Sequence, residues 1–102
     1  LILRLCMTDY PFVHKKAIKG ATTSFIFNKY VSKIVPHLLD KKGIINVGGK
    51  KRDILDFANK FSNKKIASVK FKDVNNFPKN SSIEIKKLKK TLKKSFIKKI
   101  IF

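Results

Sequence analysis

The amino-acid sequence predicts an α/β fold in which short strands alternate with helices. A short apolar run opens the chain at residues 1–6, and later segments carry apolar residues at three- and four-residue spacings. Further short apolar or alternating runs separate these segments. The short apolar and alternating runs are typical of strands, and the three- and four-residue spacings are typical of one face of a helix. With 102 residues, 43% of them hydrophobic, the chain can form the core of one domain at most.

The first predicted strand covers residues 1–6, LILRLC, and its nearly continuous apolar pattern indicates burial on both faces. Residues 7–23 follow without clear periodicity and contain Pro11 and Gly20, so we expect a long loop there. Long ordered loops in small domains are usually functional. Because the chain opens directly in a strand, with Leu1 and not Met, we also expect it to start inside a larger protein.

A helix is predicted from about Asn28 to residue 40. Pro36 falls inside its pattern and predicts a kink, because proline cannot donate the helical hydrogen bond. The sequence Lys41-Lys42-Gly43 suits a helix end, where cations and a flexible glycine are favoured. The predicted apolar face comprises Val31, Ile34, Val35, Leu38 and Leu39.

Residues 44–47 form the second predicted strand, and Gly48-Gly49 predicts a tight turn that leads directly into a helix over residues 52–61. We expect the turn because glycine adopts backbone angles that other residues resist. Asp53 lies in the first turn of this helix, where a negative charge is favourable, and Asp56 can pair with Lys60. The apolar side of this helix comprises Ile54, Leu55, Ala58 and Phe61.

Residues 66–72 alternate well enough to predict a third strand, with Ala67, Val69 and Phe71 on one face, and residues 73–80 predict a loop. A basic amphipathic helix is expected over residues 81–102, beginning with a capping box formed by Ser81 and Glu84. Its apolar stripe, set among eight lysines, comprises Ile85, Leu88, Leu92, Phe96 and Ile100.

The net charge of +19 suggests a nucleic-acid or membrane partner, but the kind of charge argues against it. Arg4 and Arg52 are the only arginines among 25 basic residues, and arginine is the residue that best clamps phosphates and reads bases. The joint abundance of lysine, asparagine, isoleucine and phenylalanine points instead to an A- and T-rich coding bias. Docking of the last helix on an anionic membrane or nucleic acid therefore stays an alternative, and it predicts steep salt dependence.

The single cysteine, Cys6, excludes a disulfide framework and fits a reduced, cytoplasmic setting. His14 and His37 lack metal-ligand spacing to another histidine, cysteine or carboxylate, so no metal is predicted. No apolar run approaches the roughly 20 residues that a membrane-spanning helix needs.

The glycine pair at 48–49 raises the question of phosphate binding. A dinucleotide turn needs G-x-G-x-x-G and a P-loop needs Gly-Lys-Ser/Thr, and the segment VGGKKRD has neither. We therefore interpret Gly48-Gly49 as a turn that holds no phosphate, with Arg52 as a minor candidate for anion binding.

Several segments, taken in order along most of the chain, resemble the C-terminal part of the extended short-chain dehydrogenases/reductases. These segments are Ile2-Leu3-Arg4, Tyr30-Val31-Ser32-Lys33-Ile34, Ile45-Asn46-Val47-Gly48-Gly49 and Pro78-Lys79-Asn80-Ser81-Ser82-Ile83 with Lys87-Leu88. The last is similar to the P-x-N-S-x-L…K-L segment of the dTDP-4-dehydrorhamnose reductases. Two departures, Phe77 where the family has arginine and Arg52 where it often has serine or threonine, leave the sugar undetermined.

The resemblance implies the C-terminal fragment of a Rossmann-like NAD(P)-binding fold with its substrate-binding portion. The family reduces the C4 ketone of a nucleotide sugar with NADPH or NADH. Its glycine-rich cofactor turn and Y-x-x-x-K pair are absent here, because neither Tyr10 nor Tyr30 has a lysine four residues on. We therefore expect no catalytic or cofactor-binding residues in this chain, and inactivity without a missing N-terminal half. A UDP- or GDP-sugar epimerase or reductase of the same superfamily stays an alternative, and a homodimer is left open.

The expected role of the chain is binding of the nucleotide-sugar substrate. The residues after the first strand should face the sugar, because ligands of α/β folds bind at the carboxyl ends of strands. Lysines in the predicted loop, or Arg52, could neutralise the pyrophosphate, and Asn80 and Ser81 could hydrogen-bond the ligand. For Asn80 and Ser81, a hydrogen bond to the nearby backbone is as compatible with the sequence as a hydrogen bond to the ligand. The candidate residues are Cys6, Met7, Thr8, Lys15, Lys16, Arg52, Asn80 and Ser81.

Overall fold

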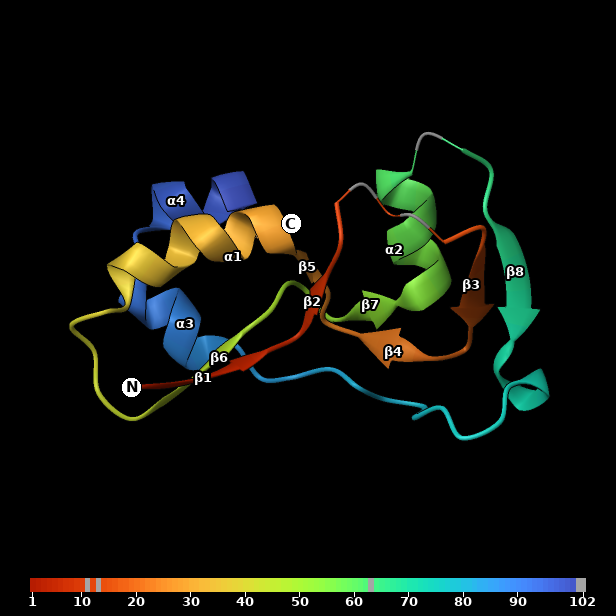
Figure 1. Cartoon of the computed structure of the whole chain (residues 1–102), viewed down its shortest axis with the longest axis horizontal. Helices are drawn as coiled ribbons and strands as arrows, with labels where there is room; N and C mark the ends of the chain where they lie inside the picture. Colours follow the sequence, from red (N-terminus) through yellow and green to blue (C-terminus); the bar gives the residue numbers. More distant parts are fainter. Residues whose placement is uncertain (11, 13, 63, 101–102) are drawn as a thin grey trace.

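The computed structural model describes residues 1–10, 12, 14–62 and 64–100, and within them it has mixed helix and strand structure built on short strand pairs (Figure 1). Three of the pairs described are parallel and one is antiparallel, so the α/β prediction holds at this level. The parallel pairs are β1 (Ile2–Leu5) with β6 (Ile44–Val47), β2 (Met7–Thr8) with β5 (Ile26–Phe27), and β3 (Lys16–Lys19) with β8 (Ala67–Lys70); the antiparallel pair is β4 (Thr22–Thr23) with β7 (Arg52–Asp53).

The helices are short and lie against these pairs. The α-helices are α1 (Asn28–Ile34), α2 (Ile54–Phe61), α3 (Lys86–Thr91) and α4 (Lys94–Ile100), and the 3₁₀ turns are η1 (Val35–His37) and η2 (Phe71–Asp73). Asp53 caps α2, since its carboxylate accepts a hydrogen bond from the backbone N–H of Leu55 at 2.9 Å. The same carboxylate accepts from the N–H of Gly20 at 2.7 Å, which ties α2 to the β3–β4 connection.

Two hydrophobic cores divide the molecule into two lobes, which Figure 1 shows on either side of β2 and β5. The first core lies among α1, β6 and α3 and centres on Ile34, Ile45 and Leu88. The second lies between α2 and β3 and is rich in aromatic rings. There the ring of Phe57 lies 5.3 Å from that of Phe27. The chain is accordingly elongated, measuring 43 × 28 × 18 Å.

The expectation that the first strand is buried on both faces is wrong. Ile2 is 60% exposed, and Leu1 and Leu5 are also exposed, whereas Leu3 packs at the margin of the first core. In the described part of the chain β1 pairs along one edge only, with β6, and no element covers its second face. The apolar pattern therefore correctly predicts a strand but not its surroundings.

The predicted loop over residues 7–23 is also wrong, because it contains β2, β3 and β4. These strands are two to four residues long, too short to show a periodic pattern, and each pairs with a strand far along the chain. The part of that expectation that concerns Pro11 lies outside the described residues.

The first predicted helix is confirmed as far as Ile34, and the rest of its span needs correction. The chain continues as η1, with Pro36 at the start of that turn, so proline changes the helix type and does not bend a continuous α-helix. Val31, Ile34 and Leu38 are buried as predicted, but Leu39 is 69% exposed, so the predicted apolar face does not extend to it. Gly43 has a φ of 84°, consistent with the predicted glycine turn.

Gly48 and Gly49 lie in the irregular connection between β6 and β7, where no turn is assigned, and the expected reason for glycine is wrong, since neither has a positive φ. A Cβ added at Gly48 would lie 2.8 Å from the carbonyl oxygen of Ser24, and one added at Gly49 would overlap the carbonyl oxygen of Phe25. Glycine is therefore needed for close approach of two backbones. The connection leads into β7 and only then into α2, which begins at Ile54 and not at residue 52.

The third predicted strand is confirmed only as β8, because η2 begins at Phe71. Its predicted apolar face is only partly buried. Val69 and Phe71 are half-buried, whereas Ala67 is exposed and the buried residue is Ile66, just before the strand.

The single helix predicted over residues 81–102 is wrong in two respects. Helix α3 starts at Lys86, and an extended residue, Leu92 with ψ of 150°, separates it from α4. Ser81 does not cap a helix, because its hydroxyl donates to the carbonyl of Thr22; instead Glu84 accepts from the N–H of Lys86 at 2.8 Å. The stripe residues Ile85, Leu88 and Leu92 are buried and Phe96 is half-buried, while the side chain of Ile100 and residues 101–102 lie outside the description.

Replacing Gly49 by alanine should destabilise the protein by about 1–3 kcal/mol, the usual cost of forcing an extra methyl group into a packed site. The new Cβ would displace the backbone of Phe25. The midpoint of urea unfolding measures the effect. Lys50→Ala is the matched control, since Lys50 is exposed in the same connection and should change stability by less than about 0.5 kcal/mol. Equal midpoints for both variants would contradict the close-approach argument.

Candidate functional site

The candidate site lies at the carboxyl ends of the parallel strands β1 and β6. Cys6 follows β1, and Gly48 follows β6. Residues 22–24 and 81–83, from distant parts of the sequence, pack across this end of the pair. Ligands of α/β folds commonly bind at such an edge.

Cys6 is the point where three of these segments meet. Its sulfur lies 3.5 Å from the hydroxyl of Thr23 and donates to the carbonyl of Ser81 at 3.9 Å. Its backbone N–H donates to the carbonyl of Val47 at 3.0 Å, at the end of β6. Cys6 thus joins the strand pair to the segment around Ser81.

Ser24 makes the second junction and is completely buried. Its hydroxyl accepts from the N–H of Ile83 at 3.2 Å and donates to the carbonyl of the same residue at 3.5 Å. Its own carbonyl accepts from the N–H of Gly49 at 2.7 Å. Because that N–H is engaged, Gly49 cannot offer it to a phosphate.

A hollow of about 340 Å³ opens beside this junction, and we call it the basic hollow. Three lysines line it against one carboxylate, that of Glu84. Its electrostatic character therefore favours an anion. Its lining residues are Gly49, Lys50, Lys51, Ser82, Ile83, Glu84, Ile85 and Lys89.

Of the candidate residues predicted from the sequence, Cys6, Asn80 and Ser81 lie at this junction. Ser81 is bound to the carbonyl of Thr22 through both its N–H, at 2.9 Å, and its hydroxyl, at 3.2 Å. Asn80 forms an isolated parallel β-bridge with Thr22, and its side-chain oxygen accepts a hydrogen bond from the N–H of Ser82 at 3.0 Å. Both side chains therefore have local structural roles.

Thr8 and Lys16 line a different hollow, of about 240 Å³, that has an aromatic wall of Phe12, Phe25 and Phe77. Met7 is exposed in β2. Lys15 is exposed as well, and its carbonyl accepts from the N–H of Ala67 at 3.1 Å. The structure therefore distributes these candidates over the junction, one hollow and the open surface, and none of them lines the basic hollow.

Arg52 lies in β7, half-buried beside α2, and lines neither hollow. Burial lowers the pKa of its guanidinium group, and the nearby carboxylate of Asp56 opposes this shift without reversing it. The guanidinium carbon lies 5.5 Å from the centre of the Phe61 ring. These contacts give Arg52 a role in holding α2 against β7.

The sequence reasoning missed the lysines of the basic hollow. Lys50 and Lys51 directly follow the glycine pair, and this adjacency was the available signal. Lys89 could not have been found in this way, since only the fold brings α3 to the connection after β6. No sequence pattern marks Ser24 as a buried junction.

No family model matches the chain, and comparison with curated proteins and with solved structures finds no match. Across residues 1–10, 12, 14–62 and 64–100, no helix has the length and apolar character to cross a membrane. The same residues contain no group of three or more histidine, cysteine or acidic side chains that could hold a metal ion.

Replacing Ser24 by alanine should destabilise the protein by about 1–3 kcal/mol, because the N–H of Ile83 would lose its buried acceptor. Thermal and urea unfolding would measure the loss. Ser32→Ala serves as control: its hydroxyl also bonds to a backbone carbonyl, that of Lys29, but it is exposed. A Ser24 variant as stable as the Ser32 variant would mean that the junction does not hold the two segments together.

Proposed function

We propose that this chain is the substrate-binding, C-terminal part of an NAD(P)H-dependent reductase of 4-keto nucleotide sugars, similar to the dTDP-4-dehydrorhamnose reductases. One observation carries the proposal. Ile2-Leu3-Arg4 and Ile45-Asn46-Val47 pair in parallel as β1 and β6, and the segment at 80–83 packs at their carboxyl ends through Cys6 and Ser24. Three segments that carry the resemblance thus converge where an α/β fold binds its ligand.

The surroundings of β1 support the presence of a further, catalytic half in a Rossmann-like fold. Parallel sheets are ordinarily covered on both faces, yet the exposed face of this pair presents the paired residues Ile2 and Ile44. The side-chain oxygen of Asn46 on β6 is buried, with no hydrogen-bond donor among the described residues. A second structural layer would cover the apolar side chains and could supply that donor.

In this proposal the chain binds and orients the substrate and does not itself reduce it. The lysines of the basic hollow, Lys50, Lys51 and Lys89, would neutralise the pyrophosphate of the nucleotide sugar. The described residues offer no glycine-rich turn for NADPH or NADH, so the missing half would hold the cofactor and the proton donor for the C4 ketone. The setting of such an enzyme would be cytoplasmic.

Two alternatives share part of this support. An epimerase or reductase acting on a UDP- or GDP-sugar would use the same arrangement, because the basic hollow distinguishes phosphate from sugar but not one base from another. A basic module for an anionic membrane or nucleic acid is favoured by a single observation, the eight lysines without an acidic residue over Lys86–Lys99. Its binding would fall steeply with added salt.

The decisive experiment reads the coding sequence upstream of Leu1. The proposal expects a G-x-x-G-x-x-G turn followed by Y-x-x-x-K in the same reading frame. An unrelated upstream sequence, or a stop codon, would overturn the reductase assignment and leave the basic module as the better interpretation.

The chain itself should bind dTDP weakly through the basic hollow. Replacing both Lys50 and Lys51 by glutamine should weaken binding by about threefold or more, the effect expected for two exposed charges. Nuclear magnetic resonance titration with dTDP at low salt would measure it. Lys70→Gln/Lys72→Gln removes the same charge from the other lobe and should leave the affinity unchanged. Equal losses in the two double variants would show only non-specific attraction to a cationic protein.

A further inference from the structure

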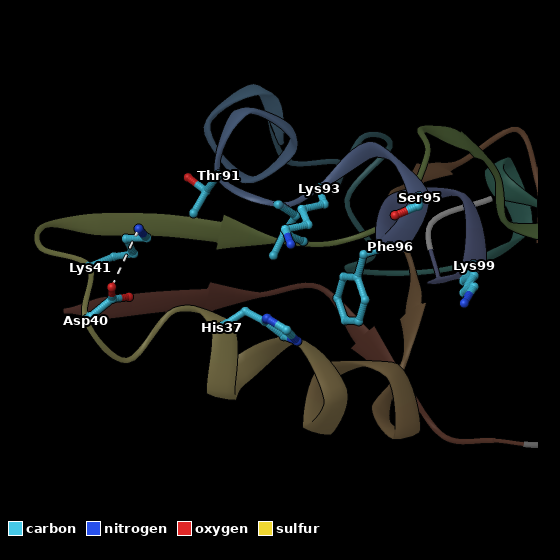
Figure 2. A pocket seen from close by; sticks show the side chains of 9 residues that line it. His37, Asp40, Lys41, Thr91, Lys93, Ser95, Phe96 and Lys99 are labelled. Atoms are coloured by element: carbon cyan, nitrogen blue, oxygen red, sulfur yellow. Dashed lines mark ion pairs between the residues drawn. The ribbon is translucent and has the colours of Figure 1, made fainter.

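A separate hollow of about 350 Å³ lies between the end of η1 and the helices α3 and α4, and Figure 2 shows it from close by. It shares no lining residue with the basic hollow. One wall comes from residues just before β6, and the other from the break between α3 and α4. The lining residues are His37, Asp40, Lys41, Thr91, Leu92, Lys93, Ser95, Phe96 and Lys99.

Two aromatic rings form one side of this hollow. The ring centres of His37, on η1, and Phe96, on α4, lie 4.6 Å apart with an angle of 52° between the ring planes, and Figure 2 shows the two side chains next to each other. Phe96 is half-buried and packs at the margin of the first core, which fixes the position of its ring. His37 is exposed. Because the two rings contact each other, a planar ligand would stack on an outer face of the pair and not between the rings.

The other side is cationic. Asp40 lies 3.8 Å from the ammonium group of Lys41, so these two charges largely offset each other. Lys93 and Lys99 have no acidic partner within ion-pair distance among the described residues. In Figure 2 the side chain of Lys93 lies between Thr91 and Phe96, on the side of the hollow opposite His37. Figure 2 shows Lys93 and Lys99 on either side of Phe96, so the cationic groups border the aromatic surface from two sides.

The break at Leu92 creates this arrangement. A continuous helix would carry Lys93 and Phe96 onward in the direction of α3, but the extended backbone at Leu92 redirects α4. Phe96 consequently reaches His37 on η1. Leu92 itself remains buried in the first core, so the break costs the core little apolar contact.

We propose that this hollow binds a phosphate monoester carried on an aromatic ring system, such as a free nucleoside monophosphate. A phosphate monoester carries a charge of about −1.5 to −2 at neutral pH, so the lysines that line this hollow attract it. A base can stack on an exposed aromatic face, as in nucleic-acid-binding proteins. The volume lies in the range of about 300–1,000 Å³ that is usual for small-molecule sites. This site goes beyond the proposed reductase function and does not depend on it.

The test titrates the full chain with AMP, adenosine and inorganic phosphate in separate nuclear magnetic resonance experiments at low salt. AMP should shift the backbone signals of residues 37–41 and 91–99, and it should bind at least about fivefold more tightly than adenosine or phosphate alone, since stacking and charge act together. Lys93→Gln should weaken the binding of both AMP and phosphate. Lys72→Gln, which removes an exposed lysine from η2, should leave both unchanged.

Phe96→Leu separates the aromatic contribution from the charge. This variant should weaken the binding of AMP about fivefold, within the range measured for removal of a stacking partner, and it should leave the binding of inorganic phosphate unchanged. His37→Gln tests the same wall without touching the core, and it decides the matter if Phe96→Leu proves unfolded. Equal affinities for AMP and phosphate, AMP binding that His37→Gln leaves unchanged, or shifts spread evenly over all lysines would each overturn the proposal.

Discussion

The close approach of residues 48–49 to residues 24–25 is the constraint on which the rest of this structure depends. It is possible only because both Gly48 and Gly49 lack a side chain, and it fixes the end of β6 against the segment that leads into β5. The side chains of the two residues of β5, which follow this contact, point into different cores. Ile26 enters the first core and Phe27 the second, as alternation along a strand requires. One backbone contact therefore sets the position of both cores.

The charge distribution follows from the same architecture. Helix α3 buries Leu88 in the first core, and α4 packs the half-buried Phe96 and Ile97 against it, so the lysines of both helices are left at the rims of hollows and on open surface. With a net charge of +19 these ammonium groups repel one another, and anions should relieve that repulsion wherever several converge. Lysines line both the basic hollow, which α3 borders, and the hollow beside His37, which the break after α3 and helix α4 border.

The parts of the fold that could be predicted are those in which one element carries its own pattern. The apolar face at Val31, Ile34 and Leu38 and the strand at 44–47 were found in this way, whereas β2 and β4 have only two residues each and exist because of distant partners. The break at Leu92 escaped prediction because the lysine-rich sequence around it suits a helix equally well. For the site, Cys6 and Ser81 were named, but the buried Ser24 and the lysine Lys89 come together only through tertiary packing.

The order in which the strands pair has a consequence for synthesis on the ribosome. In the described part of the chain β1 pairs only with β6 and β3 only with β8, and both partners follow much later in the sequence. Parallel pairings between such distant segments form slowly, because the loop between them must be ordered first. Leu3 and the strands of the second core will therefore stay exposed until β6 and β8 have emerged, which makes these segments dependent on protection from aggregation.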